Sequence, residues 1–187
     1  DGNLLGQITA DSSGVWSFTV DSSGAFSDGS HAITAKAKTS SAGNLSSASG
    51  ALTITIDASV PTAPSTPDLD SSSDTGSSNT DNVTSDSTPT FTGTAEASST
   101  VELFDGGSSL GTTTADNSGN WSFTVGSSSA LPNGSHAITA KATDAAGNVS
   151  DASSALSITI MAIPTLSSAT YDVSSGELTV TGTNFVT

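Results

Sequence analysis

An internal repeat with a period near 105 residues constrains this chain more than any other feature. Residues 5–37 and 110–142 align without a gap, and both copies contain the segments WSFTV and GSHAITAKA. After one extra residue in the first copy, residues 42–56 match residues 146–160. Such a period is too long for a small solenoid repeat and suits a whole β-sandwich of about 100 residues. We therefore predict two copies of one domain.

The repeat divides the chain into three parts. Residues 58–160 are predicted to form a complete domain, whereas residues 1–57 lack the counterpart of residues 58–104 and form a partial one. Residues 161–187 begin a third, different β repeat. The chain therefore reads as a window from a longer array. Truncation is a simpler account of the partial domain than a true subunit that exchanges strands with a neighbouring chain.

Apolar and polar residues alternate in the segments between turn-forming sequences such as DSSG and PNG. This period of two, with many Thr, Val and Ile, is typical of half-buried strands. The predicted strands are 16–20, 31–37, 51–56, 89–95, 100–105, 121–125, 136–142, 155–160 and 176–182. No segment has a helical period, so we expect an all-β fold of tandem Ig-like β-sandwiches with Greek-key connections, joined head to tail. The expected core of the complete domain is Phe91, Trp121, Phe123, Val125, Ile138, Leu156 and Ile158.

Composition excludes several classes of function. The formal net charge is −15, with three Lys, no Arg and two His, so the chain cannot neutralise a run of nucleic-acid phosphates. The same charge opposes binding to an anionic membrane surface, and no apolar run approaches the ~20 residues that span a bilayer. The absence of Cys excludes disulfides and Cys-based zinc sites.

The sequence offers no catalytic constellation. His31 and His136 are equivalent positions of the two copies, and a repeated His at the start of a strand is typical of a structural residue. Neither GxGxxG nor GxxxxGK occurs, and we therefore do not expect an enzyme. Trp16 and Trp121 are also equivalent, and we assign them to the core or the edge of a sandwich. Stacking of an exposed Trp on a sugar is the alternative.

Acidic residues are concentrated between positions 68 and 86. Asp, Asn and Ser at short spacing around a Gly supply several hard oxygens in a flexible loop, and Ca²⁺ takes about six to eight such oxygens. No EF-hand is present, because no Glu stands at the twelfth position of a matching loop. A solvated acidic loop without metal is the alternative. The candidate ligands in this loop are Asp68, Asp70, Asp74, Asn79, Asp81 and Asp86.

A second acidic group is predicted to meet at one end of the complete sandwich. In an Ig-like topology, Asp57 lies in the linker that enters the domain. Glu96, Asp116 and Asp144 then lie in three loops at the end that faces the preceding domain. Such a group would gather oxygens at a domain junction. For Asp116, the sequence Asp-Asn-Ser-Gly also forms a good turn without any ion.

Four of these segments together resemble the Ig-like repeats of giant type I-secreted adhesins of Gram-negative bacteria, the biofilm-associated and RTX-type adhesins. The segments are SDTGSSNTDNVTSDSTPTFTGTAE, DNSGNWSFTV, LPNGSHAITAKATDAAGNVS and the ITID–Pro linker, and the resemblance covers residues 1–160. It implies tandem Ig-like domains that form an extracellular stalk at the bacterial cell surface, with Ca²⁺ at the domain junctions. Such a stalk projects a distal binding region for adhesion or biofilm formation.

The resemblance also implies metal ligands and partners. Carried over residue by residue, it points first to Asp57, Asp74, Asp81 and Asp144, and then to Asp70, Asn79, Glu96 and the carbonyl of Thr75. Met161 stands where Asp57 stands in the earlier linker, so the second junction lacks one expected carboxylate. The expected partners are neighbouring Ig-like domains of the same chain and, through distal domains, a host or biofilm surface. The alternatives are a glycan- or host-binding module and an accessory domain of a secreted hydrolase.

Overall fold

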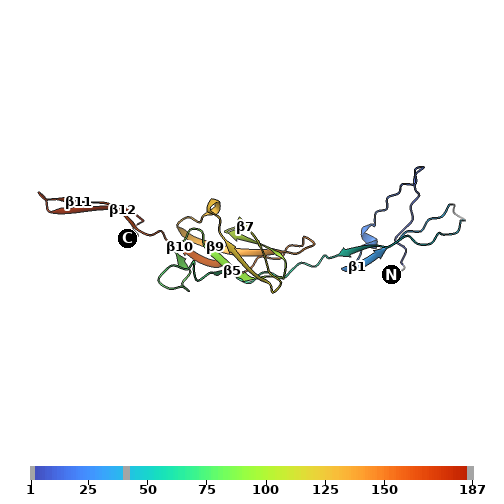
Figure 1. Cartoon of the computed structure of the whole chain (residues 1–187), viewed down its shortest axis with the longest axis horizontal. Coiled ribbons are helices and arrows are strands. Elements are labelled where there is room, and N and C mark those ends of the chain that lie inside the picture. The colour runs from blue at the N-terminus through green and yellow to red at the C-terminus, as the bar shows by residue number, and fades with distance from the viewer. Residues whose placement is uncertain (1–2, 40–42, 185–187) are drawn as a thin grey trace. The chain divides into compact units, whose positions relative to one another are not determined.

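The computed structural model describes residues 3–39 and 43–184, which belong to two compact units, Asp1–Ser59 and Val60–Thr187. In the described ranges the regular elements are β-strands and two short 3₁₀ helices, with no α-helix (Figure 1). The predicted all-β fold is confirmed. Within the same ranges, no helix has the length and apolar character needed to cross a membrane.

The complete copy is a sandwich of two sheets, which together occupy residues 68–160. One sheet has the strand order β4-β10-β9-β6-β7 and the other has the order β3-β5-β8. Neighbouring strands are antiparallel, except that β4 pairs in parallel with the end of β10. The strands are β3 (Asp68–Leu69), β4 (Val83–Thr84), β5 (Thr90–Thr94), β6 (Thr100–Asp105), β7 (Ser108–Thr114), β8 (Asn120–Thr124), β9 (Gly134–Thr143) and β10 (Leu156–Ile160); the 3₁₀ helix η2 (Ser127–Ser129) precedes β9.

The core lies between the two sheets and follows the alternation of the strands. Along β9, every second residue from His136 to Ala142 is buried, as expected for a strand with one face inward. Opposite them, β5 and β8 contribute Phe91 and Trp121. The expected core is confirmed, with Phe123 and Leu156 packing at its margin. The prediction missed Leu69, Val101, Leu103, Ala115, Leu131, Ala140 and Ile160.

The chain passes through the sandwich from one end to the other. It enters beside the end of β5, where the amide of Ser65 donates to the carbonyl of Thr94. It leaves at the end of β10, where Ile160 pairs with both Thr84 and Gly134. Thr94 and Thr90 are the two ends of β5, and Thr84 lies a short connection before Thr90. The entry beside Thr94 and the exit beside Thr84 are therefore at opposite ends of the sandwich. We call them the linker end and the exit end.

The first copy contains the 3₁₀ helix η1 (Ser22–Gly24) and one hairpin of β1 (Gly29–Ile33) and β2 (Leu52–Ile56). The prediction of a strand over residues 16–20 is wrong in this copy, and the strand predicted over 31–37 ends at Ile33. In the complete copy, the equivalent of residues 16–20 is β8, which pairs with β5. Among the described residues, the first copy has no counterpart of β5, so this segment has no partner strand there.

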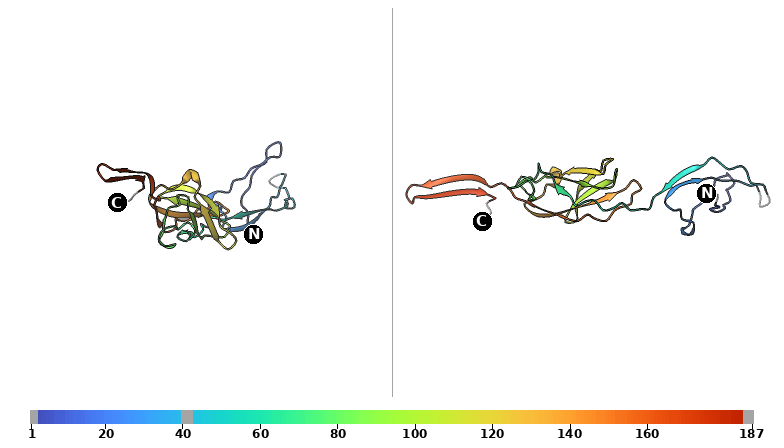
Figure 2. Two further views of the ribbon diagram at one scale, coloured as in Figure 1. Left: turned by 60° about the vertical axis from the view of Figure 1, so that its left-hand side comes forward. Right: turned by 90° about the horizontal axis from the view of Figure 1, so that it is seen from below.

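A second hairpin follows the complete copy, drawn in red in Figure 2. It consists of β11 (Thr165–Asp172) and β12 (Glu177–Thr183), paired in antiparallel fashion with an irregularity after Leu166. The strand predicted over 176–182 corresponds to β12. Every described residue of both strands is exposed.

Candidate metal centre

The acidic loop that follows β3 lies at the exit end of the sandwich. Its first turn is closed by the amides of Ser73 and Asp74, which both donate to the carbonyl of Asp70 at 2.8 and 3.0 Å. The loop then returns to β4, whose parallel pairing with β10 fixes it beside the point where the chain leaves the domain. The loop is therefore anchored at both ends by strands of different sheets.

The structure describes the whole of this loop. Among its acidic side chains, Asp74 is the one that is deeply buried. It is 5 % exposed, and its Oδ2 accepts the backbone N–H of Asn82 at 3.1 Å. Its Oδ1 is buried and has no hydrogen-bond partner among the described residues. Burial of a carboxylate oxygen without a donor is costly, and such an atom calls for a physical explanation.

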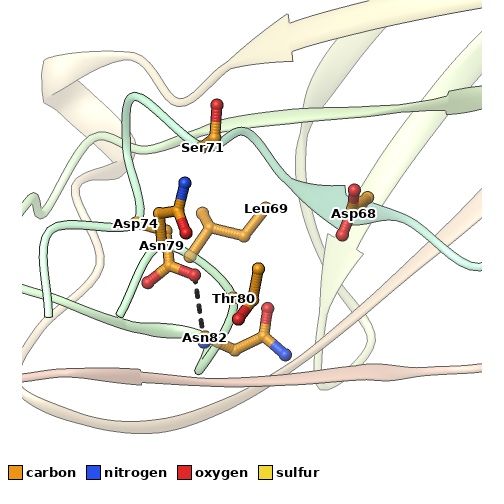
Figure 3. A pocket seen from close by; sticks show the side chains of 7 residues that line it. All are labelled: Asp68, Leu69, Ser71, Asp74, Asn79, Thr80 and Asn82. Carbon is orange, nitrogen blue, oxygen red and sulfur yellow. Dashed lines mark hydrogen bonds between the residues drawn. The ribbon is translucent and has the colours of Figure 1, made fainter. Parts of the chain in front are cut away.

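A polar hollow of about 260 Å³ lies against Asp74 (Figure 3). Its lining residues are Asp68, Leu69, Ser71, Asp74, Asn79, Thr80 and Asn82. Six of these seven side chains carry an oxygen, which is the ligand type of hard cations such as Ca²⁺, and none of them is basic. The orphaned carboxylate oxygen and this donor set together fit a bound cation.

Three residues that line the hollow and carry a side-chain oxygen, Ser71, Thr80 and Asn82, are not among the ligands predicted from the sequence. Asn82 adopts a left-handed backbone conformation with φ of 57°, which Asn tolerates better than most residues. This conformation places its N–H on Asp74 while its side chain lines the hollow (Figure 3). The sequence signal that would have drawn attention to it is the adjacency of Asp81 and Asn82 after a Ser/Thr-rich turn.

Asp81, another predicted ligand of the loop, is held mainly by donors of its own turn and also interacts with the side chain of Asp74. Asp81 accepts hydrogen bonds from the Ser77 hydroxyl at 2.9 Å and from the amides of Val83 and Ser78 at 3.1 and 3.2 Å. The bond from Ser77, followed by those from the amides, holds the pKa of Asp81 below its usual value. Asp81 and Thr75 line a second hollow of about 470 Å³, which Met161 also lines.

The Asp70 carboxylate accepts hydrogen bonds from within its own turn. Its Oδ1 accepts the hydroxyl of Ser72 at 2.6 Å and the amide of the same residue at 2.9 Å. These bonds, led by the one from the hydroxyl, hold the pKa of Asp70 below its usual value. Asp86 likewise accepts the amide of Thr88 at 2.8 Å. Of the ligands predicted in this loop, three line the first hollow: Asp68, Asp74 and Asn79.

Glu96, Asp116 and Asp144 belong to three loops at the linker end, as predicted. The amide of Ala95 donates to the carbonyl of Gly119 at 2.9 Å, and Thr100 pairs with Thr143. These contacts place the three loops at one end of the sandwich. Across residues 3–39 and 43–184, however, no three acidic or His side chains converge closely enough to form a metal cluster.

The carboxylates of Asp116 and Asp144 have the same structural role. Asp144 Oδ1 accepts the amides of Ala146 and Asn148 at 2.8 and 2.9 Å, and its Oδ2 accepts the Asn148 side chain at 2.8 Å. Asp116 Oδ1 accepts the amides two and four residues later at 2.8 and 2.9 Å. Hydrogen bonds to the ionised form, from the Asn148 side chain for Asp144 and from the Asn120 amide for Asp116, lower both pKa values. Both residues stabilise turns.

The first copy carries Asp57 at its own exit end. Its Oδ1 accepts the amide of Ser59 at 3.1 Å. Beside it, Asp28 accepts the amide of Ala58 at 3.0 Å and the hydroxyl of Ser59 at 2.6 Å. Asp28 is not among the residues predicted from the sequence. Its position directly before Gly29, which pairs with Ile56 in the hairpin, was the available signal.

His136 is held between two acceptors. Its Nδ1 lies 2.7 Å from Asp105 Oδ2, and its Nε2 lies 2.8 Å from the carbonyl oxygen of Pro132. Both partners are acceptors when Asp105 is ionised, so this arrangement favours the protonated ring, in which both nitrogens donate. Burial alone lowers the pKa of His136, but the bonds to Asp105 and Pro132 and the charge of Asp105 raise it above its usual value.

Trp121 is 3 % exposed, with its ring packed over Gly93. The interpretation of Trp121 as a surface for stacking on a sugar is therefore wrong, because a buried ring offers no face to a ligand. The alternative interpretation, a core residue, is confirmed.

The chain is similar to parts of known proteins. Among solved structures, it is similar to a BSP domain of a biofilm-associated protein, at 21 % identity over 72 % of this chain and 20 % of that chain, with a TM-score of 0.37. It is also similar to a Ca²⁺-stabilised adhesin with which an Antarctic bacterium binds ice, at 24 % identity over 75 % of this chain and 33 % of that chain, with a TM-score of 0.37.

The chain thus spans about a fifth and a third of the length of these two proteins. A search of curated proteins found no match. A sequence profile of the bacterial Ig-like domain matches residues 1–58 and again residues 60–160. Together with the sandwich of residues 68–160, these two matches show that the chain belongs to the bacterial Ig-like domain family.

Proposed function

We propose that this chain is an extender segment in the stalk of a large bacterial surface adhesin, located outside the cell. The observation that carries the proposal is the passage of the chain through the complete domain, which enters at the linker end and leaves at the exit end. Tandem copies built in this way each add the length of a sandwich to the distance between their neighbours. The partners of each domain are then the adjacent Ig-like domains of the same chain, and adhesion belongs to distal domains.

We further propose that Ca²⁺ stabilises this segment at the acidic loop. The support is the buried Oδ1 of Asp74, which lacks a donor among the described residues, together with the oxygen-lined hollow that Asp74 borders. A cation bound there satisfies this oxygen and offsets part of the net charge of −15. Asp74 and the side chains of Asn79, Thr80 and Asn82 would hold the ion. At the domain junctions, Asp57, Glu96 and Asp144 remain the proposed ligands, with Asp81 and Thr75 on the exit side.

Calcium titration of the 187-residue chain by calorimetry tests the loop site. We expect saturable binding that Asp74→Asn removes, because the substitution takes away the buried carboxylate beside the hollow. Asp116→Asn is the matched control, since it changes a carboxylate of equal charge in a turn at the other end. At a free Ca²⁺ concentration about 100-fold above Kd, binding should stabilise the second unit by about 2.7 kcal/mol. Absent binding, or binding that Asp74→Asn leaves intact, would contradict the metal assignment.

Small-angle scattering of the same chain, with Ca²⁺ and then with a chelator, tests the extender function. A junction that is held by the metal predicts a larger radius of gyration with Ca²⁺ and a reversible decrease after chelation. Dimensions that do not respond, together with calorimetric binding at Asp74, would limit Ca²⁺ to a role inside the domain.

A further inference from the structure

Asn133 is the residue directly before β9, at the exit end of the complete sandwich. Of the Asn residues in the chain, it is the one that is followed by Gly. We propose that Asn133 is a site of spontaneous deamidation, and that an aspartate formed there supplies the exit end with the linker-binding carboxylate that Asp28 provides in the first copy.

The local geometry leaves both reacting residues exposed. Asn133 and Gly134 are both exposed, and a Cβ added to Gly134 would meet no atom within 4 Å. Within the described part of the chain, the side-chain amide of Asn133 makes no hydrogen bond. By contrast, the amide of Asn148 donates to Asp144 at 2.8 Å, and that of Asn120 donates to Asp116 at 3.4 Å. Those two side chains are held away from the amide that follows them in sequence.

The reaction needs only water as co-reactant. The backbone nitrogen of Gly134 attacks Cγ of Asn133, a C–N bond forms, and the side-chain nitrogen leaves as ammonia after taking up a proton. The product is a five-membered succinimide. Water then opens the ring at one of its two carbonyl carbons and gives either an aspartate or an isoaspartate. Gly favours the attack because it has no Cβ to obstruct the approach of the side chain.

The first copy shows what a carboxylate does at this position. Asp28 is the equivalent of Asn133, and it holds the linker through the amide of Ala58 and the hydroxyl of Ser59. The hairpin register is the same in both copies, since Gly29 pairs with Ile56 and Gly134 pairs with Ile160. The equivalents of Ala58 and Ser59 are therefore Ala162 and Ile163. An aspartate at position 133 therefore accepts the Ala162 amide in the way that Asp28 accepts the Ala58 amide, whereas Ile163 offers no hydroxyl.

Peptide mass spectrometry tests the modification on the intact 187-residue chain. After incubation at mildly alkaline pH, we expect Asn133 to convert several-fold faster than Asn117, which precedes Ser118 and is the next least hindered position. Liquid chromatography separates the aspartate and isoaspartate products. Asn133→Gln should abolish the new acidic species on ion exchange. Conversion at Asn133 that is no faster than at Asn117 would overturn the proposal.

Hydrogen exchange tests the consequence. In Asn133→Asp, the Ala162 amide should exchange several-fold more slowly than in the unmodified chain, while the Ala58 amide of the first copy should not change. Asp28→Asn is the reciprocal variant and should accelerate exchange at Ala58 alone. Unchanged exchange at Ala162 in Asn133→Asp would overturn the assignment of a linker-binding role.

Discussion

The two copies carry nearly the same sequence, yet only the second buries its apolar side chains. Trp16 is 54 % exposed, whereas the equivalent Trp121 is 3 % exposed. Phe18 is exposed as well, while Phe123 packs against the core. The second copy also contains residues 60–104, which contribute Phe91, Val101 and Leu103 to its core. Among the described residues, only the second copy includes such a segment, and its greater burial depends on the side chains of that segment.

The comparison separates what a segment encodes locally from what it needs from partners. WSFTV has the alternation of a strand in both copies, but it forms β8 only where β5 lies beside it. Strand propensity largely reflects packing against neighbouring strands, so an unpaired copy of a good strand sequence stays irregular.

Several turns and local hydrogen bonds are the same in both copies. Asp11 accepts the amides two and four residues later at 2.8 and 2.9 Å, as its equivalent Asp116 does. The hydroxyl of Ser49 accepts the amide of Ala35, just as that of Ser153 accepts the amide of Ala140. These features connect residues within the shared sequence and need no further segment.

The largest effect is expected for Trp121→Ala. Truncation of a large buried aromatic side chain costs about 3–5 kcal/mol, since it leaves a cavity as well as removing apolar contacts. Trp16→Ala is the matched control in the first copy and should leave the unfolding of the second unit unchanged. Chemical denaturation followed by circular dichroism measures both. Equal destabilisation by the two variants would break the contrast between an open and a closed copy.

The next effect concerns the contact between Gly93 and Trp121. A Cβ at Gly93 would lie 2.4 Å from Cζ2 of Trp121, so Gly93→Ala forces the indole or β5 to move. Overpacking of this kind costs about 1–3 kcal/mol. Gly126→Ala is the control, because a Cβ there meets its nearest atom, Ser128 Oγ, at 3.9 Å. A denaturation midpoint that Gly93→Ala does not lower would mean that Trp121 is less tightly packed than the structure indicates.

Much of the fold could be predicted from the sequence, because alternation and repeats are local or periodic signals. The all-β class, most strands of the complete copy and the main core residues follow from them. The two-residue strands β3 and β4 were missed, since strands this short are defined by their pairing with β5 and β10 rather than by a pattern. The wrong prediction of a strand over residues 16–20 has the opposite cause. The alternating pattern is present there, but the described part of the first copy holds no partner strand.

The candidate site could be predicted only as a loop. Asp74 and Asp81 have similar neighbours in sequence, and nothing in them indicates which carboxylate is buried. In the structure Asp81 is exposed and accepts three hydrogen bonds from its own turn, whereas Asp74 is buried and accepts one backbone amide. Such an outcome depends on backbone packing, which residue types do not reveal.

A smaller effect is expected where the two copies share a hydrogen bond but differ in burial. Ser153→Ala removes the acceptor of the Ala140 amide, which is buried, and an unsatisfied buried donor costs about 1–2 kcal/mol. In the first copy the equivalent bond between Ser49 and Ala35 is exposed, so water replaces the hydroxyl in Ser49→Ala. Hydrogen exchange at the amides of Ala140 and Ala35 checks the difference. Similar changes at both amides would indicate that burial does not distinguish the copies at this site.

The smallest effect is a dependence of the stability of the second unit on pH. The pKa of His136 is raised in the folded state, above the value near 6.5 of the unfolded chain, because the attraction and hydrogen bonds of Asp105 and Pro132 outweigh the effect of burial. The stabilisation that protonated His136 provides is then fully present below its pKa in the unfolded chain. It is lost as the pH rises through the pKa of His136 in the folded state. Denaturation of the second unit at several pH values from about 5.5 to 8.5 should show a decreasing free energy of unfolding. His136→Gln and Asp105→Asn should each flatten this decrease, whereas His31→Gln changes the other unit and should leave it intact. A decrease that persists in His136→Gln would assign the pH dependence to a different group.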